Sequence, residues 1–208
     1  KIGLANILQS NNVTINTNFY WSQVPLKTDI TSGNGVLNIK VKDGEINTQK
    51  RVPGKVLSLF SFSELPKRLL LDFRDVFAEG FVFDRLEADV VFKDNIAYTC
   101  NLSIYSTTAD VIILGATNIR ERTYNQIVVV QPAVSDLLPG SAAILGGPAA
   151  AASMFLLTKI LRRPLKDAGL AYYSVNGSWD KPLIEEVRGE EIDATLIDNC
   201  SDYLPDID

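Results

Sequence analysis

Apolar and polar residues alternate along much of this chain, and a period of two is typical of β-strands. The alternation is clear in residues 37–42 and 96–104, and Asp43-Gly44 after the first run is a turn signal. Short turns between runs that follow one another favour an antiparallel meander. We therefore expect residues 79–131 to form consecutive long antiparallel strands. Further strands are expected at residues 13–21, 37–42 and 170–179.

Some of these runs are apolar on both faces. Residues 111–114 and 127–130 contain only Val, Ile and Leu, so neither face of these strands is built for water. Such strands fit a closed sandwich of two sheets, or a single sheet that is curved into an apolar trough. The sandwich is the commoner arrangement, and patterning alone leaves both open.

Helical spacing occurs in two places. Residues 54–65 carry Val56, Leu57 and Leu59 at positions that would share one face of a short helix. Residues 137–158 contain no charge, but Pro139-Gly140 and Gly146-Gly147-Pro148 interrupt them, so a helical hairpin over residues 137–166 is expected. Its second helix would be about 21 Å long, shorter than the hydrocarbon core of about 30 Å.

This hairpin is a candidate for contact with lipid, because basic residues follow its apolar run and cations can meet phosphates at the edge of a bilayer. The alternative is an ordinary hairpin that packs into the β-core. The apolar candidates for lipid or membrane contact are Leu137, Leu138, Ile144, Leu145, Met154, Phe155, Leu156 and Leu157. The candidates for facing phosphates are Lys159, Arg162, Arg163 and Lys166.

Charge is unevenly distributed along the chain. The net charge is −5, yet residues 180–208 alone hold ten acidic and two basic residues. We expect one domain over residues 1–188 and a solvated acidic tail over residues 189–208. No segment concentrates Lys and Arg with aromatic residues between them, which argues against nucleic acid as a partner.

The chain has no histidine, which removes His-based triads and His metal sites. No phosphate-binding loop or nucleophile elbow is present, so we expect no enzymatic activity, no metal site and no cofactor. Cys100 and Cys200 could form a disulfide in an oxidising compartment, or they could be two unrelated thiols. Trp179 suits either an interfacial anchor or a core residue that caps a strand.

Three segments together resemble the YhdP branch of the AsmA-like proteins, in the order and spacing of that family. They are LPKRLLLDFRDVFAEGFVFDRLEADV (residues 65–90), AAILGGPAAAASMFLLTKILRRPL (residues 142–165) and YSVNGSWDKPLIEEV (residues 173–187). The similarity runs from about residue 30 to residue 187. Cys100 and the tail after Gly189 fall outside the pattern, so the family gives them no role.

The resemblance implies an α+β fold that is mainly β: a curved antiparallel β-meander forming an apolar groove, with a short helix near 54–65 and the apolar hairpin near 137–166. It implies the C-terminal end of a periplasmic bridge-like protein, anchored in the inner membrane by a segment outside this chain, that moves phospholipid towards the inner leaflet of the outer membrane. The alternatives are a docking module for a periplasmic or outer-membrane protein and a structural cap; neither conducts lipid.

Overall fold

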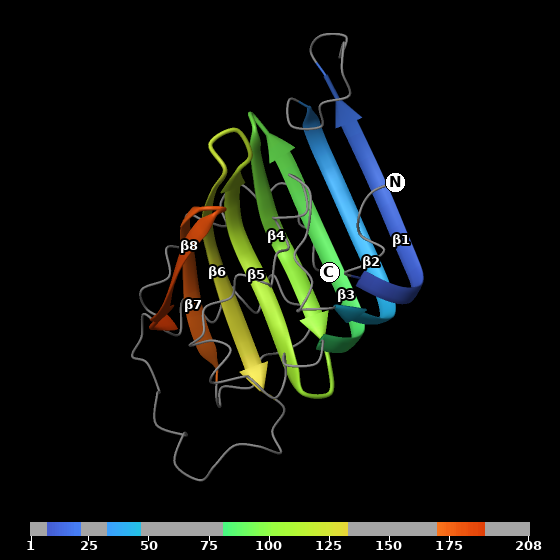
Figure 1. The fold of residues 1–208 in the computed structure, drawn as a ribbon. Coiled ribbons are helices and arrows are strands. Elements are labelled where there is room, and N and C mark those ends of the chain that lie inside the picture. Colours follow the sequence, from blue (N-terminus) through green and yellow to red (C-terminus); the bar gives the residue numbers. More distant parts are fainter. Residues whose placement is uncertain (1–7, 22–32, 47–80, 133–169, 190–208) are drawn as a thin grey trace, which may run out of the picture.

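The computed structural model describes residues 8–21, 33–46, 81–132 and 170–189, and these residues form one curved antiparallel sheet (Figure 1). The eight strands lie in sequence order, so each strand pairs with its neighbours along the chain. The strands are β1 (Leu8–Tyr20), β2 (Asn34–Ile46), β3 (Phe81–Lys93), β4 (Ile96–Tyr105), β5 (Ala109–Asn118), β6 (Thr123–Pro132), β7 (Ala171–Ser178) and β8 (Lys181–Val187).

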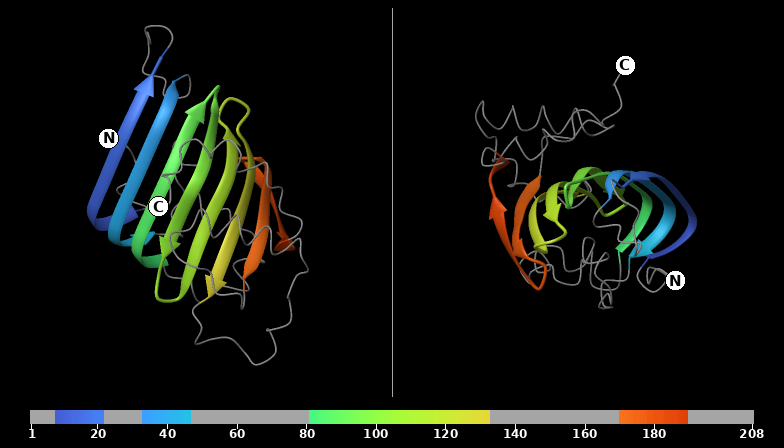
Figure 2. Two further views of the ribbon diagram at one scale, coloured as in Figure 1. Left: turned by 180° about the vertical axis from the view of Figure 1, so that it is seen from behind. Right: turned by 90° about the horizontal axis from the view of Figure 1, so that it is seen from above.

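The antiparallel meander expected over residues 79–131 is confirmed from residue 81 onward, where the described residues begin, because β3, β4, β5 and β6 follow one another there. The described strands form a single layer that curls from strand to strand into an arch, and they do not form two stacked sheets (Figure 2). The described part of the chain is thus all β, and the predicted helices at 54–65 and 137–166 lie outside it.

The turn expected at Asp43-Gly44 is wrong, because β2 continues through both residues to Ile46. Asp43 has a φ of 50°, and the pairs that would join it to Asn11 and Asp84 are missing from otherwise continuous ladders. Asp accepts the left-handed region more readily than most residues do. The turn chemistry therefore bends three strands together, and Figure 1 shows β1, β2 and β3 curling at this end.

The bend also changes which side chains face the core. Phe83 and Leu86 belong to the same buried cluster, although they are three positions apart in β3 and simple alternation would place them on opposite faces. A second change occurs in β4, where the register shifts between Thr99 and Leu102 relative to β5. The bulge adds one residue to β4, so apolar side chains before and after it along the strand share one face of the sheet.

Strand β8 is not predicted from the pattern, because Pro182 and two glutamates interrupt its apolar positions. Proline cannot donate to a ladder, and it is tolerated where a strand lies at the edge of a sheet. β8 occupies such an edge, since it pairs only with β7 among the described strands.

Two glycines with positive φ provide a matched test of the sheet geometry. Gly115 in β5 has a φ of 124°, and a Cβ atom there would clash with the Asn125 carbonyl oxygen. Gly177 has a φ of 88°, but the nearest atom to its added Cβ would be 3.7 Å away. Gly115→Ala should therefore lower the free energy of unfolding by about 3 kcal/mol or more, from backbone strain plus a backbone clash.

Gly177→Ala is the control, with an expected loss of about 1–2 kcal/mol from backbone strain alone. Urea denaturation of both variants measures the difference. Equal losses would contradict the close approach of β5 and β6 at Gly115.

Candidate functional site

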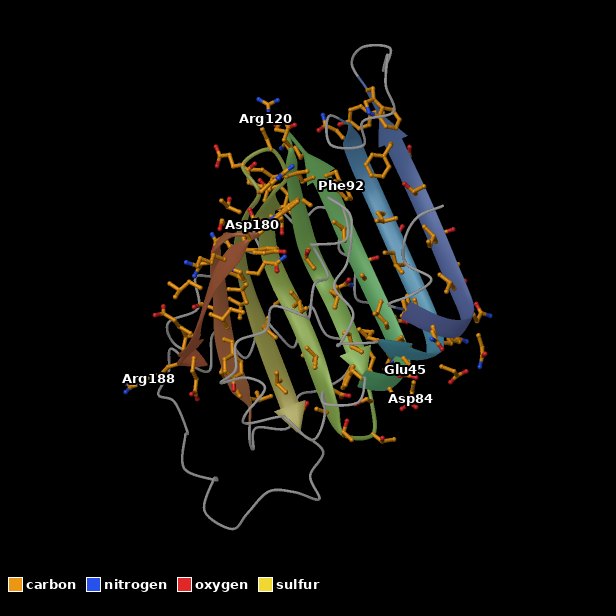
Figure 3. The ribbon with its side chains drawn as sticks, in the orientation of Figure 1. Glu45, Asp84, Phe92, Arg120, Asp180 and Arg188 are labelled. Atoms are coloured by element: carbon orange, nitrogen blue, oxygen red, sulfur yellow. The ribbon has the colours of Figure 1, made fainter. Side chains whose placement is uncertain are left out.

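The concave face of the arch carries side chains from every strand. Register and burial place these side chains in one cluster that runs from Val41 in β2 to Val175 in β7, with Ile184 of β8 packed against it. In Figure 3, which looks into the arch, Phe92 lies on this side of the sheet. We call the end of the sheet that holds the β3–β4, β5–β6 and β7–β8 turns the turn end; it is at the top of Figure 1.

Two rows of paired residues on the concave face are apolar apart from the Tyr173 hydroxyl. They lie away from the turn end, and their members are between 0% and 9% exposed, apart from Ala171, which is half-buried. Burial of an aliphatic side chain of this size stabilises a fold by roughly 1.5–3 kcal/mol. The apolar rows are Leu86–Ile104–Val111–Val130–Ala171 and Leu102–Ile113–Val128–Tyr173.

The next two rows, nearer the turn end, contain polar side chains. Thr99, Thr117 and Gln126 are only 8%, 0% and 6% exposed, and the Gln126 Nε2 donates a 3.0 Å hydrogen bond to the Thr117 Oγ1. The polar rows are Val90–Thr99–Gly115–Gln126–Val175 and Phe92–Ala97–Thr117–Tyr124–Gly177. The concave face therefore changes from apolar to mixed along the strands.

Trp179 closes the turn end of this face. Its backbone N–H donates to the Arg122 carbonyl oxygen at 2.9 Å, which ties the β7–β8 turn to the β5–β6 turn. Its ring packs on Tyr124 with centroids 6.1 Å apart, and the residue is 8% exposed. The interpretation of Trp179 as a core residue is confirmed. Its indole Nε1 is buried without a hydrogen-bond acceptor, which costs roughly 1–3 kcal/mol for such a donor.

Aromatic rings also meet on the concave face beside β1. Phe19 stacks on Trp21 at a centroid distance of 5.9 Å and packs against Phe92 at 5.1 Å. Phe19 and Phe92 belong to β1 and β3, and both pair with Gly35 of the intervening strand. Gly35 has no side chain, and a Cβ atom there would clash with the backbone of Asn18 and Phe19, so β1 approaches β2 closely beside the two rings.

The convex face of β2, β3 and β4 is polar. Asp89 accepts hydrogen bonds from the Asn38 Nδ2 at 2.6 Å and the Asn101 Nδ2 at 2.5 Å, and its N–H donates to the Asn101 Oδ1 at 2.8 Å. Asn101 comes from the bulge of β4, so the register shift positions the side chain that completes this network. The network ties three strands together.

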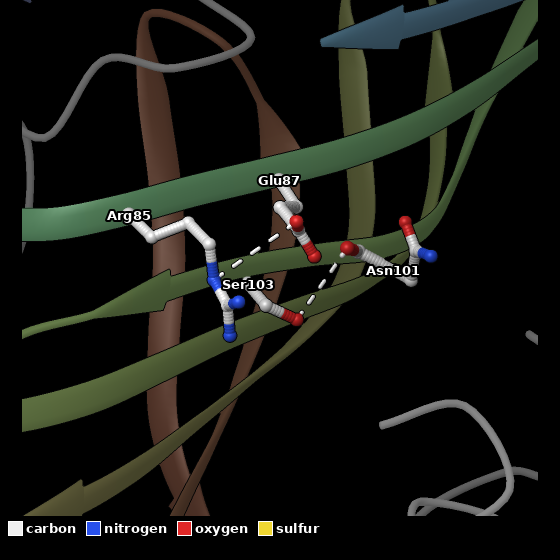
Figure 4. A network of polar contacts seen from close by, with 4 residues as sticks. All are labelled: Arg85, Glu87, Asn101 and Ser103. Carbon is white, nitrogen blue, oxygen red and sulfur yellow. Dashed lines mark hydrogen bonds and ion pairs between the residues drawn. The ribbon is translucent and has the colours of Figure 1, made fainter. Parts of the chain in front are cut away.

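Arg85 and Glu87 lie next to this network (Figure 4). Their Nε and Oε1 atoms are 3.9 Å apart, too far for a hydrogen bond, and the Arg85 guanidinium lies 4.4 Å from the Tyr105 ring centroid. Arg85 therefore combines a long ion pair with a cation–π contact.

The convex face becomes apolar at β5 and β6. Its side chains there are buried like those of the concave face, which confirms that these strands have two apolar faces. These convex residues are Ile112, Leu114, Ile127 and Val129.

An open recess of about 320 Å³ lies at the bend of β1, β2 and β3. Asp43, Glu45 and Asp84 line it together with Phe83. Within the residues that the structure describes, no group of three Asp, Glu, Cys or His side chains could hold a metal ion.

The predicted contact residues of the 137–166 hairpin, from Leu137 to Lys166, lie outside the described residues and stay predictions. The boundary between a domain at 1–188 and an acidic tail at 189–208 stays a prediction too. Cys100 belongs to β4, but Cys200 lies outside the described residues, so their pairing is untested. No helix within the described ranges is long and apolar enough to cross a bilayer.

The polar rows were missed by sequence reasoning. Thr99 and Gln126 are polar residues within strands, and a strand with one wet face would place them in water. Only the register and the β4 bulge reveal that they share the concave face with the apolar rows.

Comparison with known proteins agrees with the family resemblance of the three sequence segments. The family model described as YhdP protein matches residues 1–184. A relative from Escherichia coli (strain K12), the intermembrane phospholipid transporter YhdP, is 29% identical over 188 residues. The match covers 89% of this chain and 15% of that protein, so the chain spans a small part of its relative. No solved structure matches the chain.

The Asp89 network predicts a specific loss of stability. Asn101→Ala removes two hydrogen bonds to Asp89, one of them to its carboxylate, and should lower the free energy of unfolding by about 2 kcal/mol. Ser103→Ala is the control, because its hydroxyl makes only a 3.5 Å bond to the Asn101 carbonyl and should cost about 0.5 kcal/mol. Chemical denaturation compares the two; an equal loss would show that Asn101 does not hold the strands together.

Proposed function

The chain belongs to the YhdP family, and on that premise we propose that its sheet is the terminal segment of a groove that carries phospholipid between two membranes. The observation that carries the proposal is the continuity of the apolar rows on the concave face from β3 to β7. An acyl chain needs such a surface, because each buried CH₂ group is worth about 0.8 kcal/mol.

The opposite face of β2 to β4 supports the same proposal. Lys40 and Lys42 of β2 are exposed there, and the Asp89 network lies beside them. Lipid tails therefore have an apolar surface inside the arch and a polar one outside it at this side of the sheet. The difference between the faces favours lipid on the concave side.

The two edges of the sheet support a terminal position. β1 is 13 residues long, has neither charge nor proline, and exposes Val13 at 49% and Ile15 at 52%. β8 has seven residues, begins with Lys181-Pro182 and carries two glutamates. Charge, proline and short length protect an edge from further pairing, and a long uncharged strand invites it. We propose that another strand extends the sheet at β1 and that the sheet ends at β8.

In this proposal the whole protein works in the periplasm, is anchored in the inner membrane outside this chain, and delivers phospholipid at the inner leaflet of the outer membrane. The second candidate is a docking or capping module that binds an outer-membrane or periplasmic protein. The protected edge of β8 is also compatible with a capping module, because a cap requires that no further strand pairs with its last strand. Lipid contact along the concave face distinguishes the two.

Photo-crosslinking tests lipid contact on opposite faces of one strand. A photoreactive amino acid at Leu37 or Ile39, on the concave face of β2, should form phospholipid adducts that mass spectrometry detects in the purified chain. Lys40 and Lys42 on the convex face are the controls and should form none. Absence of adducts at the concave positions, or equal adducts on both faces, would refute the conducting groove and leave the docking module.

The edge proposal predicts self-association of the isolated chain. With its β1 edge unprotected, the chain should form dimers that grow with concentration, as analytical ultracentrifugation would show. Ile15→Lys should abolish the dimer, because a charge on an edge strand opposes pairing. Leu183→Lys changes a similarly exposed residue of β8 and should leave the dimer intact. A dimer that responds to Leu183→Lys alone would place the open edge at β8.

A further inference from the structure

We propose that the two polar rows, with Trp179, form a hydrogen-bonding subsite for the ester carbonyl groups of a glycerophospholipid. A bound lipid would then lie with its headgroup at the turn end and its acyl chains over the apolar rows. This inference rests on the proposed function and adds an orientation and a binding subsite to it.

The first step is the change in chemistry along the strands. The two apolar rows offer no polar side chain apart from the Tyr173 hydroxyl, whereas the next rows bring Thr99, Thr117 and Gln126 to the same face. A phospholipid has the same order of parts: hydrocarbon, then esters, then headgroup. A lipid whose esters lay over the apolar rows would bury carbonyl oxygens without donors, which is unfavourable.

The second step is the unpartnered donor of Trp179. This side chain is more than nine-tenths buried, and its Nε1 has no acceptor in the structure. It packs on Tyr124, a member of the same rows. An ester carbonyl is an acceptor without a donor of its own, so it would satisfy the indole N–H.

The third step is the placement of the donors. Gly115 belongs to the first polar row and adds no side chain between Thr99 and Gln126, its partners on the two adjacent strands. The Thr99 hydroxyl and the Gln126 amide therefore lie on either side of a residue that has no side chain.

The turns beyond these rows suit a headgroup. Their exposed side chains carry both signs of charge, as Arg120 and Asp180 illustrate in the upper half of Figure 3. The basic side chains of these turns can pair with the phosphate of a headgroup, and the acidic side chains can pair with its ammonium group. The charged residues of the turns are Lys93, Asp94, Arg120, Glu121, Arg122, Asp180 and Lys181.

Intrinsic fluorescence can measure the orientation. The chain has two tryptophans, Trp21 and Trp179, and both lie at the turn end. The 208-residue chain is loaded with phosphatidylcholine that carries a nitroxide either on the choline or near the end of one acyl chain, and loading is checked by native mass spectrometry. The headgroup label should cause the larger loss of tryptophan fluorescence.

A reporter in the apolar rows should give the reverse. Trp21→Phe and Trp179→Phe combined with Tyr173→Trp puts the only tryptophan in an apolar row, where the acyl-chain label should quench more. If this variant does not fold, the unaltered chain still decides. If lipid binds to the unaltered chain but the two labels quench equally, or the acyl-chain label quenches more, the orientation is overturned and the proposed function stays intact. Failure of both lipids to bind would overturn both.

Ester recognition is tested with diacyl and dialkyl-ether phosphatidylcholine, which differ only in the two carbonyl groups. The chain should bind the diacyl lipid about fivefold more tightly, the effect of one hydrogen bond. Trp179→Phe with Gln126→Leu should remove this preference, whereas Ile113→Val in the apolar rows should keep it. Equal affinity of the unaltered chain for the two lipids would refute the ester subsite.

Discussion

The register between neighbouring strands is the constraint on which the rest of this structure depends. Side chains alternate between faces with a period of two, so a slip of one residue in any ladder would move an apolar row to the convex face. Three ladders must agree for Leu102, Ile113, Val128 and Tyr173 to share the concave face. Each ladder joins two strands that are consecutive in the sequence.

Two local irregularities preserve this agreement where simple alternation would break it. The left-handed residue Asp43 lies at the bend after which Phe83 and Leu86 share one cluster. The bulge in β4 keeps Thr99 and Leu102 on the same face, and it frees Asn101 to bind Asp89. Bulges and bends also increase curvature, so the features that keep the apolar rows in line help the sheet to curl.

The curved sheet changes in two directions: the polarity of its concave face changes along the strands, and the protection of its edges differs between β1 and β8. Along the strands, the concave face passes from aliphatic rows through Thr99, Thr117 and Gln126 to charged turns. Across the strands, the sheet passes from the uncharged edge of β1 to the protected edge of β8. The first gradient matches the parts of one lipid molecule, and the second matches a sheet that is extended at one side only. Both follow from which residue types the register brings to each position.

The sequence by itself determined that residues 79–131 form an antiparallel meander, because alternation and short turns are local properties of neighbouring runs. It also carried the family, through three segments in a fixed order. The tertiary structure decided what local patterns leave open. Strands with two apolar faces fit either a sandwich or a trough, and only the tertiary structure, a single curved sheet, distinguishes the two. Asp43-Gly44 has turn chemistry, but pairing on both sides makes it a bend within β2. Thr99 and Gln126 share the concave face because the bulge in β4 and the two ladders that join β4, β5 and β6 place them there. These registers depend on pairing between strands, and no local pattern in the sequence contains them.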